Sequence, residues 1–225
     1  IVGDLDRAEA ERLAEKVTAD MQPGEAASKL PQVDGLEAGE TQRIDHPSSQ
    51  THILMGQPGM RRGDPDYFPL YVGNYVLGGG GLVSRISEEV REKRGLSYSA
   101  YSYFLPMAKR GPFILGLQTR NEQADEALQV LRQTLQGFVE KGPTEDEMEA
   151  ARKHITGGFP LRIDSNSEIL EYIAMIGFYD LPLDYLQRFN DRVNAVTRAD
   201  VMDAFQRRVQ PQRMVTVVVG EQAAD

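Results

Sequence analysis

The segment from Leu77 to Phe104, which reads LGGGGLVSRISEEVREKRGLSYSAYSYF, places the strongest constraint on the fold of this chain. Four consecutive glycines, Gly78, Gly79, Gly80 and Gly81, allow a tight turn and a close approach of two backbones. Apolar residues in 82–93 recur at helical spacing, which predicts a helix. The stripe expected to be buried contains Leu82, Ile86 and Val90. Gly95 predicts the end of that helix, and a tyrosine-rich strand is expected over 96–106.

Arg91 lies in the last turn of this predicted helix, and Tyr98 lies early in the strand that follows. Helical geometry puts Arg91 on one face with Ser84 and Ser87, away from the buried stripe. Strand alternation divides the next side chains into Tyr98, Ala100 and Ser102 on one face, and Tyr101, Tyr103 and Leu105 filling the other. Arg91 and Tyr98 are therefore expected to leave the core and meet on one surface. An arginine and a tyrosine placed there can bind a peptide carbonyl from one side.

A simpler interpretation of the same residues stands beside this one. A tyrosine in an aromatic strand is usually a packing residue, and an arginine in the last turn of a helix is usually solvated and complements the helix dipole. Arg85 and Arg94 are alternative peptide-binding arginines, each also explained as a surface charge or a local ion-pair partner.

The rest of the body predicts helices between the strands of a sheet. A strand is expected over 48–57, with Ile53 and Met55 on one face, and Asp66 is expected to cap a helix that keeps Pro69 in its first turn. Further strands are expected over 111–120 and 214–219, and a long helix over 121–141. Three more helix starts are indicated by the pairs Thr144 and Glu147, Ser165 and Glu168, and Thr197 and Asp200. This order predicts an α+β fold, with a mostly antiparallel sheet and helices packed on one face.

The two ends of the chain contain similar short apolar segments. Residues 1–6 read IVGDLD and residues 214–221 read MVTVVVGE, so both predict a buried strand that closes on Val-Gly-acidic. A helix with an apolar stripe is expected over 4–21. One interpretation is a duplicated architecture, in which residues 1–21 are the tail of an upstream homologous domain; chance similarity is the other. Residues 22–40, rich in Pro, Gly and acidic side chains, predict an inter-domain linker, and 41–225 then form the main domain.

Composition excludes several classes of partner. The net charge of −9 argues against a nucleic-acid surface and against anionic lipid, and no apolar run approaches the roughly 20 residues of a membrane span. The chain has no cysteine, which excludes disulfides and thiolate metal sites and suits the bacterial periplasm and cytoplasm alike, of which we place the periplasm first.

No metal site is predicted within this chain. Its three histidines, His46, His52 and His154, form no H-x-x-E-H or H-E-x-x-H motif, and none has a second ligand at helical spacing. No serine-nucleophile motif and no phosphate-binding loop occur either.

Residues 78–98 resemble the C-terminal-half signature of the pitrilysin/insulinase-type zinc peptidases, which include the mitochondrial processing peptidase and small bacterial two-subunit members. The matching features are the glycine turn, Ser84-Arg85, Arg91-Glu92-Lys93, Gly95-Leu96, Tyr98, Gly111-Pro112-Phe113 and the final VVVG. The resemblance covers about 41–221 and implies the processing-peptidase/LuxS-like metallohydrolase fold.

The resemblance also implies roles for individual residues. In this family zinc lies in the N-terminal half, on an inverted His-x-x-Glu-His motif and a distal Glu, so no cofactor is expected here and zinc is expected in the partner half. The Arg and Tyr with which the C-terminal half closes over substrate map onto Arg91 and Tyr98. The glycine turn maps onto Gly78 to Gly81, a predicted substrate contact, although this chain lacks the longer glycine-rich insertion of the processing peptidase's regulatory subunit.

Several functions stay open at this point. In the first, the chain is the non-zinc half that encloses and positions a peptide or unfolded polypeptide, and it is inactive when isolated. It donates Arg91 and Tyr98 to a zinc-binding N-terminal half or to a separate His-bearing subunit. The alternative is a non-catalytic scaffold or assembly subunit, since the family includes core subunits of a respiratory complex. An unrelated α+β interaction domain is the third and predicts no dependence on a metallopeptidase partner.

Overall fold

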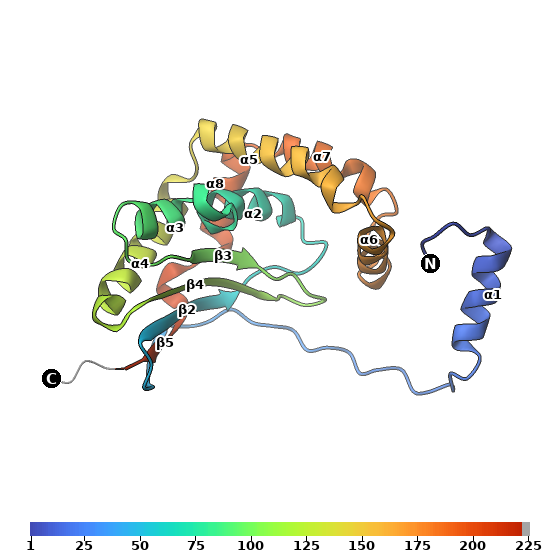
Figure 1. Cartoon of the computed structure of the whole chain (residues 1–225), viewed down its shortest axis with the longest axis horizontal. Helices are drawn as coiled ribbons and strands as arrows, with labels where there is room; N and C mark the ends of the chain where they lie inside the picture. The colour runs from blue at the N-terminus through green and yellow to red at the C-terminus, as the bar shows by residue number, and fades with distance from the viewer. Residues whose placement is uncertain (222–225) are drawn as a thin grey trace.

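The computed structural model describes residues 1–221 and shows one sheet with most of its helices on a single face, while the N-terminal helix stands apart (Figure 1). The strands are β1 (Glu40–Asp45), β2 (Gln50–Pro58), β3 (Ala100–Phe104), β4 (Pro112–Arg120) and β5 (Val215–Gly220). They lie in the order β1-β5-β2-β4-β3; β1 and β5 are parallel, and the other neighbours are antiparallel. The predicted α+β class with a mostly antiparallel sheet is confirmed.

Eight α-helices and several short helical turns are described. The helices are α1 (Arg7–Thr18), α2 (Tyr67–Asn74), α3 (Arg85–Ser87), α4 (Ala124–Lys141), α5 (Glu145–Gly158), α6 (Asn166–Phe178), α7 (Tyr185–Ala195) and α8 (Arg198–Arg208). The π-turn η1 (Tyr75–Gly79) includes the first two glycines of the glycine turn, and a second π-turn, η3 (Glu88–Glu92), follows α3 directly. The 3₁₀ turns are η2 (Gly81–Val83), η4 (Asn121–Gln123), η5 (Phe159–Arg162) and η6 (Pro211–Arg213). Within residues 1–221 no helix combines the length and the apolar character needed to cross a membrane.

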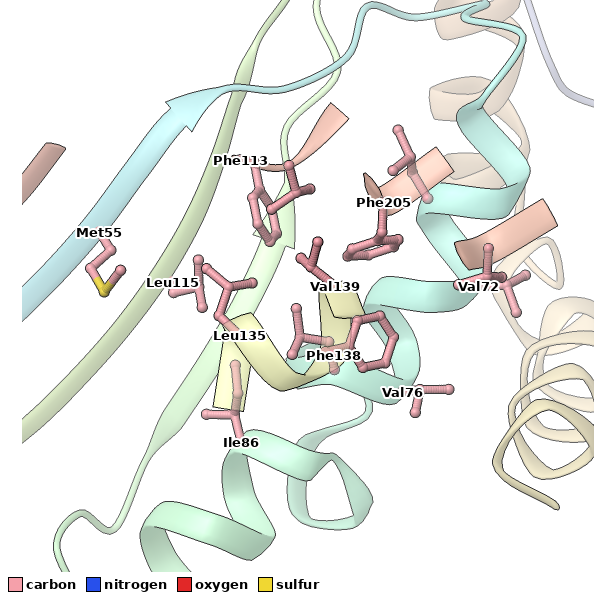
Figure 2. Close-up of a cluster of buried hydrophobic side chains, with 14 of the residues drawn as sticks. Met55, Val72, Val76, Ile86, Phe113, Leu115, Leu135, Phe138, Val139 and Phe205 are labelled. Atoms are coloured by element: carbon pink, nitrogen blue, oxygen red, sulfur yellow. The ribbon is translucent and has the colours of Figure 1, made fainter. Parts of the chain in front are cut away.

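The core lies between the sheet and the helical layer. Ile53 and Met55 point into it from β2, as their shared strand face predicts. Figure 2 shows Phe113 and Leu115 of β4 facing the side chains of α4 and α8, with Met55 on their far side. The rings of Phe138 on α4 and Phe205 on α8 pack edge to face with centroids 4.9 Å apart. Full burial of such aromatic side chains removes a large apolar area from water and stabilises the contact between the layers.

The three capping pairs read from the sequence begin α5, α6 and α8. Thr144 and Glu147 form a reciprocal capping box, with the Thr144 N–H donating to Glu147 Oε2 at 2.6 Å and the Glu147 N–H donating to Thr144 Oγ1 at 3.2 Å. Thr197 and Asp200 form the same reciprocal box at the start of α8. At the start of α6, Ser165 Oγ accepts the Glu168 N–H at 3.3 Å and donates to Glu168 Oε2 at 2.8 Å. Asp66 does precede α2 and leaves Pro69 in its first turn, but its carboxylate accepts hydrogen bonds from Arg207 instead of capping the helix.

Strand β1 was missed by the sequence analysis, which assigned residue 40 to a linker. Its sequence ETQRID is polar, and every residue of the strand is exposed, so it carries no alternating pattern. The strand forms because its backbone pairs with β5, from Glu40 opposite Val215 to Asp45 opposite Gly220. An edge strand of this kind depends on a tertiary partner that local sequence does not reveal.

The helix predicted over 82–93 begins later than expected, although Ile86 and Val90 of its apolar stripe are buried as predicted. Ser84 has extended backbone angles and its hydroxyl oxygen accepts the Ser87 N–H at 3.4 Å, so α3 begins only after Ser84. Leu82 therefore lies before the helix and is 64% exposed instead of buried. Ser84 and Ser87 are buried rather than sharing a surface face with Arg91, because the helical segment is short and continues as the π-turn η3.

The faces assigned to the tyrosine-rich strand are also reversed. Ala100 and Ser102 point under the helices, opposite Leu117 and Leu115 of β4, whereas Tyr101 and Tyr103 are exposed on the open face of the sheet. The small side chains are required on the covered face because the glycine turn packs there. The two tyrosine rings instead stack on each other with centroids 5.9 Å apart.

The N-terminal segment forms a helix but not the predicted strand. Residues 1–6 lie in neither helix nor strand, and α1 stands apart from the main domain in Figure 1 with no buried residue. The predicted apolar stripe is therefore solvent-exposed, with Val17 77% exposed, because α1 has no surface to pack against. The assignment of 1–21 to an upstream domain stays a prediction. In α6, similarly, Ile176 is the one buried residue, and Ile173 is 43% exposed.

Candidate functional site

The glycine turn is explained by a close contact with strand β3. A Cβ atom on Gly78 would lie 2.4 Å from Ser102 Oγ and 2.5 Å from the Ser102 backbone nitrogen, distances that real Cβ atoms do not adopt. Gly81 has φ +63°, a conformation that favours glycine. Asn74 holds the glycine turn close to β3, because its Nδ2 donates to the Ser102 carbonyl at 3.1 Å. The turn thus packs directly against the edge of the sheet.

The four glycines differ in how far a ligand could reach them. Gly78 is buried behind Ser102, Gly80 is partly exposed, and Gly79 and Gly81 are exposed. All four border a common cavity. Their role in substrate contact stays a prediction, and each has a backbone role that accounts for it without a ligand.

Arg91 and Tyr98 are brought together on the surface. The guanidinium carbon of Arg91 lies 4.7 Å from the centroid of the Tyr98 ring, a cation–π arrangement. Tyr98 is 85% exposed, so its ring projects into solvent and is covered on one side by the arginine. The Arg91 side chain is 27% exposed, and its Nε is 3.5 Å from Oε1 of neighbouring Glu92.

The backbone around Tyr98 is fixed by short-range hydrogen bonds. Gly95, at φ +61°, ends the helical turn, and its N–H donates to the Arg91 carbonyl at 2.9 Å. Ser97 is buried; its hydroxyl donates to the Ser99 carbonyl at 2.8 Å and accepts the Ser99 N–H at 3.2 Å. Tyr98 therefore extends from a defined loop between η3 and β3, although the sequence places it inside a strand.

The polar groups of this pair are available for another partner. Among residues 1–221 no hydrogen bond involves the Tyr98 hydroxyl. A cation–π contact at an exposed site is worth about 0.5–1 kcal/mol, so a bound peptide can replace it at small cost. The arrangement can therefore present one phenol donor and one planar set of guanidinium donors to a carbonyl or carboxylate.

Arg85 and Arg94 are occupied by local ion pairs. Arg85 donates to both carboxylate oxygens of Glu147, at 2.6 Å and 2.5 Å, and its guanidinium carbon lies 5.2 Å from the Phe138 ring centroid. Arg94 donates to the Glu89 side chain at 2.7 Å and to the Glu89 carbonyl at 2.8 Å. Of the two interpretations left open for these residues, the structure favours local ion pairing.

Zinc does not fit the residues of this chain. No group of three or more His, Cys, Asp or Glu side chains that could hold a metal occurs in the part of the chain that the structure describes. The histidines lie on separate elements: His46 follows β1, His52 is on β2, and the His154 ring on α5 lies 5.1 Å from the Tyr75 ring. No catalytic step is therefore assigned to a metal held here.

A cavity of about 720 Å³ lies beside the glycine turn, between α2, β3 and α5. Arg62, Arg162 and His154 line it, and none of them was singled out as a binding residue from the sequence. Arg91 and Tyr98 are not among its lining residues, so the structure separates the glycine turn from the Arg91–Tyr98 pair.

A sequence signal for this cavity did exist. Tyr67, Tyr71 and Tyr75 recur every four residues, which places three phenol rings on one helical face. The rings of Tyr67 and Tyr71 are stacked with centroids 5.9 Å apart, and Tyr75 continues the row into η1.

Comparison with known proteins agrees with this architecture. A family model described as the peptidase M16 inactive domain matches residues 1–155. An uncharacterized zinc protease of Streptomyces coelicolor is 35% identical over 137 residues, which cover 61% of this chain and 30% of that protein. A protein of Helicobacter pylori described as a non-peptidase homolog is 28% identical over 154 residues, which cover 67% of this chain and 35% of that protein.

A solved structure extends the match to nearly the whole chain. The crystal structure of a peptidase M16 inactive domain from Pseudomonas fluorescens aligns with a TM-score of 0.92 and 38% identity, covering 99% of this chain and 53% of that one. The chain thus spans about half of that protein and less of the curated relatives. The resemblance to pitrilysin/insulinase-type peptidases is confirmed, and the chain belongs to the family of the peptidase M16 inactive domain, the non-catalytic half of zinc protease-like proteins.

Proposed function

We propose that this domain is the half of a zinc metallopeptidase that encloses and positions a peptide or unfolded polypeptide and presents Arg91 and Tyr98 to a His-x-x-Glu-His half. The observation that carries the proposal is the exposed pair itself, with the guanidinium carbon 4.7 Å from a phenol ring that is 85% exposed. A packing tyrosine buries its ring, whereas this one extends into solvent from a fixed loop.

The chemistry of peptide hydrolysis suits these two groups. Attack of water on a peptide carbonyl places negative charge on its oxygen, and the Tyr98 phenol can donate a hydrogen bond to that oxygen. Removal of one such preorganised donor costs on the order of 100-fold in rate. Arg91 offers donors in a plane and a fixed charge, which suit backbone carbonyls or a carboxylate of the same substrate.

The other half supplies the metal in this proposal. It is either a zinc-binding N-terminal half of the same polypeptide or a separate His-bearing subunit, in the periplasm or cytoplasm of a bacterium. Its zinc polarises the substrate carbonyl and activates water when bound. This chain contributes the surface that holds the peptide against that site.

The decisive experiment measures turnover after this chain is combined with its His-bearing half. Tyr98→Phe removes only the hydroxyl and should lower turnover by about tenfold or more, with zinc content unchanged. Arg91→Gln should lower kcat/KM, because a donor set that holds the substrate is lost. Arg94→Gln removes the same charge from the same turn and is the matched control, since Arg94 pairs with Glu89.

Equal turnover for Tyr98→Phe and the wild type would remove Tyr98 from the mechanism. Equal effects of Arg91→Gln and Arg94→Gln would show that net charge, and not the position of Arg91, matters. Zinc content measured on each preparation separates these outcomes from simple loss of the metal.

A second candidate function is a non-catalytic scaffold or assembly subunit. It is favoured by the Helicobacter pylori relative, which is described as a non-peptidase homolog. A scaffold predicts that neither Arg91→Gln nor Tyr98→Phe alters any activity of the assembly, while deletion of this chain dissociates it.

A further inference from the structure

The cavity beside the glycine turn is positively charged in an acidic protein. The whole chain has 34 acidic and 25 basic residues, yet the described residues that line this cavity include Arg62, Arg162 and no carboxylate. Several other arginines do have acidic partners, such as Arg85 with Glu147 and Arg208 with Asp64. Arg62 and Arg162 form no ion pair with any carboxylate of residues 1–221.

Arg62 lies close to two aromatic rings. Its guanidinium carbon lies 5.6 Å from the ring centroid of Tyr67 and 5.5 Å from that of Tyr179, and Nη1 donates to the Tyr67 hydroxyl at 3.2 Å. Its Nε is buried and has no hydrogen-bond partner within the described chain. A buried donor without a partner is costly, so a ligand that brings an acceptor to this guanidinium group would be favoured.

Arg162 enters the same cavity from η5. Its Nη1 donates to the Tyr71 hydroxyl at 3.2 Å, and Tyr71 stacks on Tyr67, the ring beneath Arg62. Both guanidinium groups also lie close enough to Tyr172 to lower the pKa of that phenol, although burial raises it more. The two positive charges are therefore neighbours that converge on one set of tyrosines.

These tyrosines do not neutralise the arginines. Burial raises the pKa of Tyr67, of Tyr75 and of Tyr172 above that of a free phenol, so all three are uncharged near neutral pH. The hydroxyl groups of Tyr67 and Tyr71 accept hydrogen bonds from Arg62 and Arg162, which positions the guanidinium groups and leaves both charges uncompensated. A cavity with this lining favours an anionic ligand.

We propose that this cavity binds a carboxylate of a polypeptide, with Arg62 and Arg162 as the cationic donors and the exposed Gly79 and Gly81 as the wall that lets the peptide backbone approach. Arginine donors are arranged in a fork that matches a planar carboxylate. The carboxylate is either an acidic side chain or the C-terminus of the chain. The choice of a polypeptide rests on the proposed function, whereas the choice of a carboxylate rests on the cavity alone.

The test is an NMR titration of the whole chain with three N-acetylated Gly-Ser peptides of equal length. One contains a central Glu and an amidated C-terminus, one contains Gln and a free C-terminus, and one contains Gln and an amidated C-terminus. The side-chain Nε–H resonances of Arg62 and Arg162, assigned from the variants Arg62→Gln and Arg162→Gln, report binding directly. One or both carboxylate peptides should shift them and bind about tenfold or more tightly than the uncharged peptide.

The protein variants give the second arm. Arg62→Gln or Arg162→Gln should reduce binding of the carboxylate peptide by about tenfold, whereas the control Arg61→Gln, which removes the same charge from the exposed neighbour outside the cavity, should leave it unchanged. Equal binding of all three peptides by the unaltered chain would overturn the proposal, even if a variant fails to fold. Equal effects of Arg61→Gln and Arg62→Gln would overturn it as well.

The outcome is separable from that of the proposed function. Carboxylate binding is measured on this chain without its partner, and the Tyr98→Phe experiment measures turnover in the assembled enzyme. If the carboxylate peptides fail to bind but Tyr98→Phe still lowers turnover, only the cavity proposal is overturned. If they bind but Tyr98→Phe leaves turnover unchanged, only the catalytic role of Tyr98 is overturned.

Discussion

Asn74 and Ser102 join the helical layer to the edge of the sheet by two buried hydrogen bonds. Asn74 Nδ2 donates to the Ser102 carbonyl at 3.1 Å, and Ser102 Oγ donates to Asn74 Oδ1 at 2.7 Å. Ser102 lies on β3, the edge strand, whose outward backbone groups would otherwise need water or another strand. The contact sets the position of the glycine turn and therefore of the cavity beside it.

We expect Asn74→Ala to lower the free energy of unfolding by about 1–3 kcal/mol, because the buried carbonyl and hydroxyl of Ser102 lose their partner. Asn194→Ala, at an exposed helical position of α7, is the control and should change it by no more than about 0.5 kcal/mol. Urea unfolding of both variants measures the difference. Equal values for the two would show that the pair does not stabilise the sheet edge.

Gly78→Ala should destabilise the domain by about 1–3 kcal/mol, because the added methyl group would overlap the backbone of Ser102. Gly137→Ala in α4 is the matched control: its Cβ would meet nothing within 4 Å, and we expect a gain of about 0.4–1 kcal/mol. Thermal unfolding of the two variants should therefore shift in opposite directions. A Gly78→Ala variant as stable as the wild type would contradict the close contact.

The pH dependence of stability should contain a contribution from Glu147. Burial raises the pKa of this carboxyl, but the hydrogen bonds from Arg85 and from the Thr144 backbone lower it more, so it lies below the usual value. The stabilisation is therefore complete above the unfolded pKa of about 4.3 and is lost as the pH falls through the lower folded value. Glu147→Gln should flatten the fall in unfolding free energy below about pH 5.

Glu149→Gln provides the control for that measurement, since it removes an exposed carboxylate from the same helix, one without an ion pair in the described chain. Its pH profile should follow the wild type. A Glu147→Gln profile parallel to the wild type would show that the Arg85 pair does not couple to folding.

Tyr98→Ala should lower the free energy of unfolding by less than about 1 kcal/mol, because the ring is 85% exposed and loses only a surface cation–π contact. Phe138→Ala, which empties a core position, should cost about 3–5 kcal/mol by comparison. Urea midpoints of the two variants provide the test. A large loss for Tyr98→Ala would make the residue structural and would weaken its assignment to substrate.

Local chemistry made several elements predictable. Thr144 with Glu147 and Thr197 with Asp200 satisfy the free N–H groups of their own helices, so they act within four residues and need no tertiary partner. The alternation that buries Ile53 and Met55 is equally local, because successive strand residues point to opposite faces.

Errors occurred where a distant segment decided the outcome. The tyrosine-rich strand alternates as expected, but periodicity does not say which face meets the helices. The packing of Gly78 decides which face of β3 is covered, because only the small side chains of Ala100 and Ser102 let the glycine turn pack on their face. Strand β1 likewise exists only through its pairing with β5, more than a hundred residues later.

The sequence alone determined the α+β class and the starts of α5, α6 and α8. It also determined the proximity of Arg91 to Tyr98, since seven residues across a glycine-ended turn leave little freedom. Tertiary structure decided that Arg85 forms an ion pair with Glu147, and that Arg62 and Arg162 line one cavity without a carboxylate. Those two arginines are separated by a hundred residues of chain. Electrostatic interaction depends on distance in space, and only the packing of α2 and α5 beside β3 sets that distance.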